Sequence, residues 1–284
     1  MENRNQEKKM ENRFIDLPGI NNARDIGGYP AGGKHIRTGA LLRSGKLCNA
    51  GPGTLAVLSG KYHVKYIVDF RMAKGKDQVP DPEVEGAEII KLPVVELEDY
   101  IAKAGKPELA DQYLSGDGVK DPKVLFRLAY EYGMLSPDMY LLLLFGERGR
   151  KAYREFFRLL VSHDPEQGAI LWHCEDGKDR AGLAAMLILS SLGADRKAVI
   201  EDYLLTNEGN QARITKTRAA CEAAGMTPDM TEAMIFSNGG VFGHYMTFAL
   251  DTLENKYGSV EGYVREELGV TAEELELLRE KYLE

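Results

Sequence analysis

The sequence predicts an α/β fold with a central parallel or mostly parallel sheet of about four to five strands, flanked by helices. Short apolar runs of strand length alternate along the chain with longer segments in which apolar residues recur at helical spacing. Three of these runs, at 41–43, 64–70 and 169–172, end at polar or charged residues. Because ligands bind at the carboxyl ends of strands in open parallel sheets, a functional site is expected there.

The composition argues against several classes of function. The chain has 284 residues, of which 44% are hydrophobic and 28% charged, and its net charge is -8. An acidic protein without a dense basic stripe is a poor nucleic-acid binder, so we expect no nucleic-acid partner. The three cysteines are widely spaced and offer neither a disulfide framework nor a zinc-binding spacing. We therefore expect no metal, no cofactor and a reducing compartment.

Residues 1–13 are polar and charged, and they contain no apolar stretch. We expect a frayed or disordered tail here, followed by a single domain over 14–284 that is long enough to bury a sizeable core. Neither a signal peptide nor a membrane anchor is visible, which favours a cytoplasmic protein without stable membrane insertion and leaves secretion by another route open. The oligomeric state is left open as well.

The first part of the chain predicts short strands separated by turns. Residues 14–45 are rich in glycine and proline and end in the first core strand at 41–43. A short helix at 54–60 precedes an apolar parallel strand at 64–70, and a third strand is expected at 88–95. Together with the run at 169–172, these strands would form the core of the sheet.

Residues 96–166 form a helical insertion that is far longer than an ordinary connection between strands. Helical spacing recurs over 124–145 and 150–161. The insertion is either a lid or covering subdomain over the site, or a set of helices packed on the sheet, and the sequence leaves both open. Its tyrosines would line a pocket for an aryl phosphate or belong to a helical core; they are Tyr100, Tyr113, Tyr130 and Tyr132.

The chain after residue 180 is predicted to be helical. A strongly apolar helix at 181–192 must be buried against the sheet. The last helix begins with a capping box formed by Thr271 and Glu274. The other expected helices lie at 194–205, 210–224, 241–257 and 260–268, with a break between 225 and 240.

The stretch 169–182, AILWHCEDGKDRAG, carries the strongest functional signal. It predicts a strand, a tight loop and a helix, with Cys174 and Arg180 six positions apart across the turn. A thiolate favoured by the helix N-terminus can attack a phosphate ester, and a guanidinium can bind the phosphoryl oxygens through two parallel hydrogen bonds. The groups expected to bind phosphate, mainly through backbone N–H, belong to Glu175, Asp176, Gly177, Lys178, Asp179 and Arg180.

This stretch resembles the signature loop of bacterial cysteine-dependent tyrosine phosphatases, in the branch related to lipid and protein phosphatases whose loop reads His-Cys-x-x-Gly-Lys-Asp-Arg. Other stretches resemble the same family and extend the likeness over nearly the whole chain; they are NARDIGGY at 22–29, IRTGALLRSG at 36–45, IVDFR at 67–71, EDYLLTN at 201–207 and YGSVEGYVREELG at 257–269. The resemblance implies a tyrosine-phosphatase-like α/β domain. The plain structural alternative is a buried cysteine that closes a strand.

The resemblance implies a phosphomonoester hydrolase that works through a phosphocysteine intermediate, without metal. Phosphotyrosine in a protein is the expected substrate, with phosphoserine, phosphothreonine and phosphoinositides as further candidates because Lys178 would add a mobile cation at the mouth of the site. A non-catalytic phosphate-binding pseudophosphatase is the main alternative. A redox or sulfur-transfer protein is a weaker one, since no second cysteine lies near Cys174 in the sequence.

The general acid for the leaving group is expected to be Asp179, which the resemblance favours, with Asp69 as the second choice and Glu96, Glu98 and Asp99 left open. The side chains of Glu175 and Asp176 would have to point away from the phosphate. Many relatives carry serine or threonine directly after the loop arginine, where this chain has Ala181, so slow hydrolysis of the intermediate is expected. The expected supporting residues are His173, Asp69, Arg71, Asn22, Arg24, Asp25 and Arg43.

Overall fold

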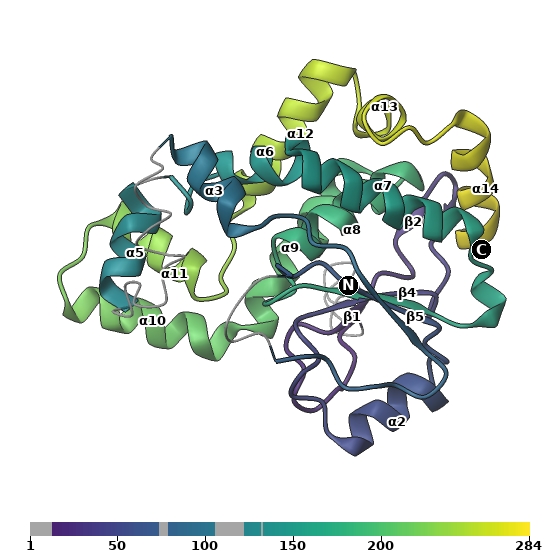
Figure 1. Cartoon of the computed structure of the whole chain (residues 1–284), viewed down its shortest axis with the longest axis horizontal. Coiled ribbons are helices and arrows are strands. Elements are labelled where there is room, and N and C mark those ends of the chain that lie inside the picture. Colours follow the sequence, from purple (N-terminus) through teal and green to yellow (C-terminus); the bar gives the residue numbers. More distant parts are fainter. Residues whose placement is uncertain (1–12, 74–78, 106–121, 132) are drawn as a thin grey trace, which may run out of the picture.

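The computed structural model describes residues 13–73, 79–105, 122–131 and 133–284, so the expected tail lies almost wholly outside it. Its main sheet has five strands in the order β1-β4-β7-β5-β6 (Figure 1). The edge strand β1 is antiparallel to β4, and the other neighbours are parallel, which confirms the predicted fold class. The strands are β1 (Arg24–Asp25), β4 (Leu41–Ser44), β5 (Tyr66–Asp69), β6 (Glu88–Lys91) and β7 (Ile170–His173), and a separate hairpin pairs β2 (Pro30–Ala31) with β3 (Lys34–His35).

Strand β7 lies in the middle of the sheet, and its register with its neighbours determines which residues meet at the edge. His173 is paired with Ser44 of β4 on one side and with Asp69 of β5 on the other. The three central strands, β4, β7 and β5, therefore end at the same edge of the sheet. The chain segments that leave these strands begin next to one another, at the edge where a site was expected.

The two faces of the sheet pack against different helices, as Figure 1 shows. Leu42, Ile67 and Leu171 belong to one apolar cluster with Leu58 of α2 (Pro52–Gly60). Leu41, Val68, Ile170 and Trp172 belong to the other cluster, with side chains of α7 (Glu147–Ser162) and α8 (Arg180–Ser191). Strands buried on both faces read as continuous apolar runs, which is why the sequence pattern could locate them.

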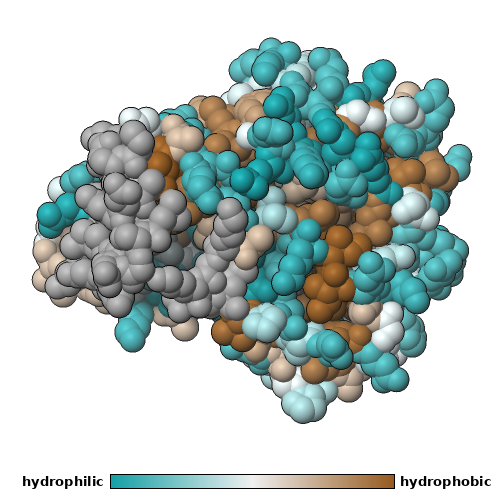
Figure 2. Space-filling model, viewed as in Figure 1, coloured by the Kyte–Doolittle hydropathy of each residue, from teal (hydrophilic) through white to brown (hydrophobic). Residues whose placement is uncertain are grey.

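Helix α8 is buried almost all the way round, whereas α7 is amphipathic. The indole N–H of Trp172 donates to the carbonyl of Ala181 at 3.0 Å and so ties β7 to the first turn of α8. In Figure 2 the side chains over α7 are mainly hydrophilic, because this helix buries one stripe of its surface, which includes Tyr153, Phe156 and Phe157. Each described helix is too short or too polar to cross a bilayer.

The insertion and the chain after α8 supply the remaining helices. Figure 1 places α3, α5, α10 and α11 together on the side of the molecule away from α14, and α5 contacts α11. The insertion helices are α3 (Leu97–Ala104), α5 (Pro122–Glu131) and α6 (Asp138–Phe145). The later helices are α9 (Arg196–Gly209), α10 (Gln211–Ala223), α11 (Pro228–Ser237), α12 (Gly243–Tyr257), α13 (Val260–Glu266) and α14 (Ala272–Tyr282).

Three expected element boundaries were wrong. The helical pattern over 124–145 is two helices, because Gly133 adopts a positive φ of 67° and Pro137 follows before α6 begins. The expected break between 225 and 240 contains α11, which Thr227 caps through its side chain. The strand expected at 88–95 ends at Lys91. The capping box of Thr271 and Glu274 is confirmed at the start of α14.

The burial of α8 leads to a stability prediction. Leu187 is fully buried, so Leu187→Ala leaves a cavity and should lower the free energy of unfolding by about 2–5 kcal/mol. Leu277→Ala on α14 is the control, because Leu277 is 37% exposed and its loss should change stability by less than about 0.5 kcal/mol. Urea unfolding followed by circular dichroism measures both. Equal midpoints for the two variants would contradict the packing described here.

Candidate active site

The loop 174–179 joins the end of β7 to the first residue of α8. Cys174, which is 1% exposed, follows the last residue of the strand, and Arg180 begins the helix. The positive end of a twelve-residue helix and its free N–H groups therefore lie at the loop. This is the strand, loop and helix that the sequence predicted.

Gly177 brings the middle of the loop against the end of β4. Its φ is +68°, and a Cβ at this position would lie 2.5 Å from the carbonyl carbon of Ser44. Any other residue would be strained in this conformation and would also collide with backbone. Glycine is therefore required here for both reasons.

Two carbonyl groups of the loop are held by side chains from the N-terminal part of the chain. Asn22 Nδ2 donates to the carbonyls of Asp176 at 3.2 Å and Gly177 at 3.0 Å, and Arg43 donates to that of Gly177 at 2.8 Å. A trans peptide directs its N–H opposite to its carbonyl. The N–H groups of Gly177 and Lys178 therefore point to the other side of the loop, where they can bind an anion.

Asp202 of α9 fixes the arginines behind the loop. The carboxylate of Asp202 contacts both Arg43 and Arg24, and all three side chains are at most 2% exposed. Arg24 also donates to Asn22 Oδ1 and to the carbonyl of Asp202, so one buried network connects Asn22, both arginines and α9. Burial would raise the pKa of Asp202, but the charges of Arg43 and Arg24 outweigh it and hold that pKa below its usual value. Burial lowers the pKa of Arg24 to about 10, which leaves it charged at neutral pH.

Two acidic side chains of the loop, those of Glu175 and Asp176, are paired with cations from other parts of the chain. Glu175 forms an ion pair with Lys46, and Asp176 forms one with Arg213 of α10 at 2.9 Å. Cations from outside the loop thereby balance both charges. Asp25, by contrast, is not brought to the loop: its carboxylate accepts from the N–H groups of Gly27 at 2.8 Å and Gly39 at 2.7 Å and so supports the turns around the hairpin.

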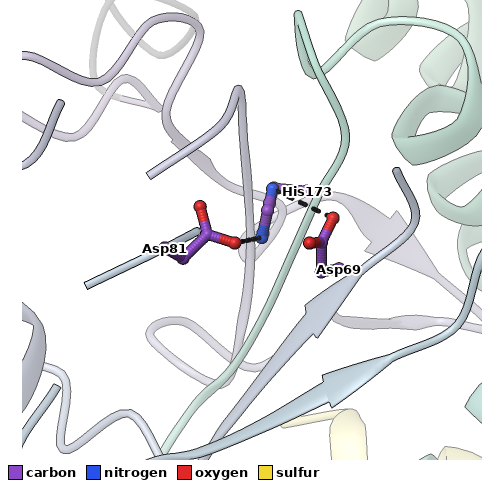
Figure 3. A group of neighbouring side chains, drawn as sticks. All are labelled: Asp69, Asp81 and His173. Atoms are coloured by element: carbon purple, nitrogen blue, oxygen red, sulfur yellow. Dashed lines mark ion pairs between the residues drawn. The ribbon is translucent and has the colours of Figure 1, made fainter. Parts of the chain in front are cut away.

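A second buried cluster lies beside His173 at the ends of β5 and β7 (Figure 3). Arg71 donates to Asp69 at 2.8 Å and to Asp81 at 2.6 Å, and His173 Nε2 lies 3.1 Å from Asp81 Oδ2. Burial would raise the pKa of Asp69, but hydrogen bonds from Arg71 and the charge of His173 lower it overall. Asp69 is thus a carboxylate that is bound to arginine beside His173.

The same cluster has the residue types of a metal site. Ligand atoms of Asp69, Asp81 and His173 lie within 4.8 Å of one another. The guanidinium of Arg71, however, already forms hydrogen bonds to both carboxylates and supplies the cation that a metal would otherwise provide. His173 Nδ1 is 3.3 Å from the carbonyl oxygen of Cys174, so the cluster is in contact with the backbone of the cysteine.

Lys178 does not reach the mouth of the site, contrary to the expectation of a mobile cation there. Its side chain is 5% exposed, and Nζ donates to the carbonyl of Phe236 at 2.6 Å while lying 3.5 Å from the centre of the Phe236 ring. The same Nζ is 3.3 Å from Asp179 Oδ2. The loop lysine is therefore held by the end of α11.

Asp179 contacts a helix of the insertion, and Arg180 donates to the carbonyl of Phe70 at 3.5 Å. Asp179 Oδ1 accepts from the hydroxyl of Tyr140 at 2.8 Å, and its side chain is 17% exposed. Burial would lower the pKa of Arg180, but the nearby groups of Cys174, Tyr100 and Asp179 raise it overall. Burial raises the pKa of Tyr100 to about 12, so this tyrosine of α3 is a neutral neighbour of the loop.

The other candidates of the insertion lie elsewhere or have other partners. Glu96 accepts from the N–H of Ala73 at 2.6 Å, and Asp99 caps α3 while pairing with Arg148 at 2.8 Å. Glu98 lies in the first turn of α3. Tyr130 is 38% exposed and stacks on Phe126, whereas Tyr113 and Tyr132 lie outside the described residues.

Comparison with known proteins decides the family. The model of the tyrosine phosphatase family matches residues 15–284. The chain belongs to the tyrosine phosphatase family. It is accordingly a hydrolase of the protein-tyrosine-phosphatase type, as the sequence resemblance predicted.

Three relatives are 25–29% identical to this phosphatase over the residues that align. A Cupriavidus necator protein named for the tyrosine-protein phosphatases is 29% identical over 90% of this chain and 84% of its own. The triple specificity protein phosphatase PtpB of Mycobacterium tuberculosis is 28% identical over 88% of this chain and 92% of its own. A tyrosine-protein phosphatase of Nostoc commune is 25% identical over 45% of this chain and 42% of its own.

Sequence reasoning missed several residues that contact the candidate site of the phosphatase, among them Asp81, Tyr140 and Asp202. Asp202 stands inside the stretch EDYLLTN, so the family resemblance carried a signal for it. Tyr140 lies within the helical spacing over 124–145, where its position does not distinguish it from a core residue. Asp81 lies in the connection between two strands, where no pattern of spacing marks a functional residue.

Asp202 should govern acid stability. A carboxylate with a lowered folded pKa stabilises the protein fully above its unfolded value, near pH ~4, and this contribution is lost as pH falls through the folded value. Asp202→Asn leaves Arg24 and Arg43 without their counterion, so it should cost about 3–5 kcal/mol at pH 7 and flatten the loss of stability below pH ~4.

Urea unfolding at several pH values measures this effect, with Asp251→Asn as the matched control. Asp251 is 52% exposed and pairs with Arg196 at the surface, so its replacement should cost less than about 1 kcal/mol. An Asp202→Asn variant as stable as the control variant would contradict the role given to the buried network.

Proposed function

We propose that this phosphatase hydrolyses phosphotyrosine in proteins through a phosphocysteine intermediate. The observation that carries the proposal is Cys174, buried at the end of the central strand, with Arg180 opening the next helix and the loop carbonyls turned outward between them. The N–H groups and the guanidinium can bind the three non-bridging oxygens of a phosphate in line with the sulfur. Membership of the tyrosine phosphatase family supports the hydrolase activity.

The proposed reaction has two displacement steps. In the first, Cys174 Sγ attacks phosphorus, the S–P bond forms, and the P–O bond to the tyrosine breaks while Asp179 gives its proton to the departing oxygen. In the second, water attacks phosphorus and passes a proton back to Asp179, the S–P bond breaks, and inorganic phosphate and the Cys174 thiolate are released. Arg180 and the loop N–H groups stabilise the charge on the phosphoryl oxygens in both steps.

The position of Lys178 favours phosphotyrosine over substrates with several phosphates. Its ammonium is bound to the Phe236 carbonyl and to Asp179, so it is not available at the mouth for a second phosphate group in this conformation. The name of the mycobacterial relative assigns that protein a triple specificity. Phosphoserine, phosphothreonine and phosphoinositides are therefore kept as further candidate substrates for this chain.

Replacing the nucleophile tests the proposal. Cys174→Ser should lower the turnover of p-nitrophenyl phosphate and of phosphotyrosine peptides by at least about 1,000-fold, because the attacking group is lost. Arg180→Lys should lower it by about 100-fold or more, because lysine cannot form two parallel hydrogen bonds with the phosphate.

Steady-state assays on purified variants measure these effects, and circular dichroism confirms that each variant is folded. Cys48→Ser is the matched control, because Cys48 is half-buried outside the loop, and full activity is expected. A Cys174→Ser variant with wild-type turnover would rule out the mechanism. A screen of phosphotyrosine peptides, phosphoserine peptides and phosphoinositides then ranks the substrates.

Ala181 should make the second step slow. It stands where many relatives have a hydroxyl that helps to expel the thiolate, so the phosphocysteine should accumulate. Rapid-quench kinetics should show a burst of leaving group close to one per active site, and Ala181→Ser should shrink the burst and raise the steady-state rate. If the wild-type protein shows no burst, formation of the phosphocysteine, not its hydrolysis, limits turnover.

A further inference from the structure

Asp179 is the last residue of the candidate phosphate loop, and its carboxylate is bound by a tyrosine from the insertion. The hydroxyl of Tyr140, on α6, donates to Asp179 Oδ1 at 2.8 Å. The hydroxyl of Tyr203, on α9, lies 2.6 Å from that of Tyr140. Tyr140 is fully buried and Tyr203 is 1% exposed, so neither hydroxyl exchanges its partner for bulk water.

We propose that Tyr140 is a positioning residue for the general acid, and that Tyr203 orients the Tyr140 hydroxyl. The inference rests on the proposed function, in which Asp179 protonates the leaving oxygen. It adds a residue that touches neither the phosphate nor the sulfur and acts only through the carboxyl group of Asp179.

The direction of the hydrogen bonds follows from the chemistry of the three groups. An ionised carboxylate only accepts, so Tyr140 must donate its proton to Asp179. The remaining lone pairs of the Tyr140 oxygen can then accept the proton of Tyr203, which gives a chain from Tyr203 through Tyr140 to Asp179. Burial, and then the charge of Asp179, raise the pKa of Tyr140 well above its usual value, so the hydroxyl keeps its proton.

This chain distinguishes the two oxygens of the acid. Oδ1 is occupied by Tyr140, which leaves Oδ2 as the atom that carries the transferable proton. Oδ2 is also the atom that lies 3.3 Å from Lys178 Nζ. With one oxygen fixed by a buried tyrosine, the carboxyl group cannot rotate freely, and Oδ2 keeps a defined direction.

Loss of the Tyr140 hydroxyl should therefore harm only the step that needs the acid. Phenolate and tyrosinate are basic leaving groups that require a proton, whereas p-nitrophenolate leaves readily without one. Tyr140→Phe should lower kcat/KM for phenyl phosphate and a phosphotyrosine peptide by about tenfold or more, and for p-nitrophenyl phosphate by less than about threefold.

The experiment compares kcat/KM and its pH dependence over a series of aryl phosphates whose leaving groups differ in basicity. Asp179→Asn should show the steepest dependence on leaving-group basicity, Tyr140→Phe an intermediate one, and Tyr203→Phe a smaller change in the same direction. Tyr263→Phe is the matched control: Tyr263 is equally buried, but its hydroxyl donates to the carbonyl of Leu144, away from the loop. It should keep the wild-type dependence.

The possible results separate this inference from the proposed function. A Tyr140→Phe variant that slows all substrates equally, or that keeps the wild-type dependence, would overturn the positioning role while Cys174→Ser still abolishes turnover. An unchanged dependence in Asp179→Asn would overturn it too, because there would be no acid to position. If Tyr140→Phe does not fold, Tyr203→Phe alone decides: an unchanged dependence overturns the inference and a steeper one supports it.

Discussion

The candidate site depends on the direction of two peptide groups. The carbonyls of Asp176 and Gly177 are bound by Asn22 and Arg43 on the outer side of the loop, and the planar peptide then directs the next two N–H groups inward. Without that anchor, carbonyl oxygens could face a phosphate dianion and repel it. The loop, the N-terminal segment and α9 are joined at this point, because Asp202 in turn holds Arg43.

The charged side chains around the loop are also arranged so that most negative charge near it is paired with a cation. Two acidic side chains of the loop have cationic partners from other parts of the chain: Lys46 for Glu175 and Arg213 for Asp176. Behind the cysteine, Arg71 binds both Asp69 and Asp81 and so offsets part of the buried negative charge beside His173. The candidate cup itself keeps Arg180, the loop N–H groups and the helix N-terminus, all of which favour an anion.

Local sequence patterns predicted the strands, the loop and most helices, because each depends on residues close in the chain. The runs at 41–43, 64–70 and 169–172 are mainly apolar because both faces of their strands are buried, and Gly177 predicted the turn. Contacts between residues far apart in the sequence have no such local pattern. Asp202 and Arg43 are 159 residues apart, and Lys178 and Phe236 are 58 residues apart. The sequence predicts that Lys178 is a solvated cation, and only the position of α11 in the structure shows that the Lys178 side chain is buried.

The most direct test of phosphate binding by this loop is a crystal structure of the protein with orthovanadate, which mimics the phosphoryl group in the transition state of its transfer. The predicted result is vanadium bonded to Cys174 Sγ, with its equatorial oxygens on the loop N–H groups and the Arg180 guanidinium, and with Asn22 and Arg43 still bound to the loop carbonyls. Vanadate bound away from Cys174, or an Asp176 or Gly177 carbonyl turned toward it, would contradict the account.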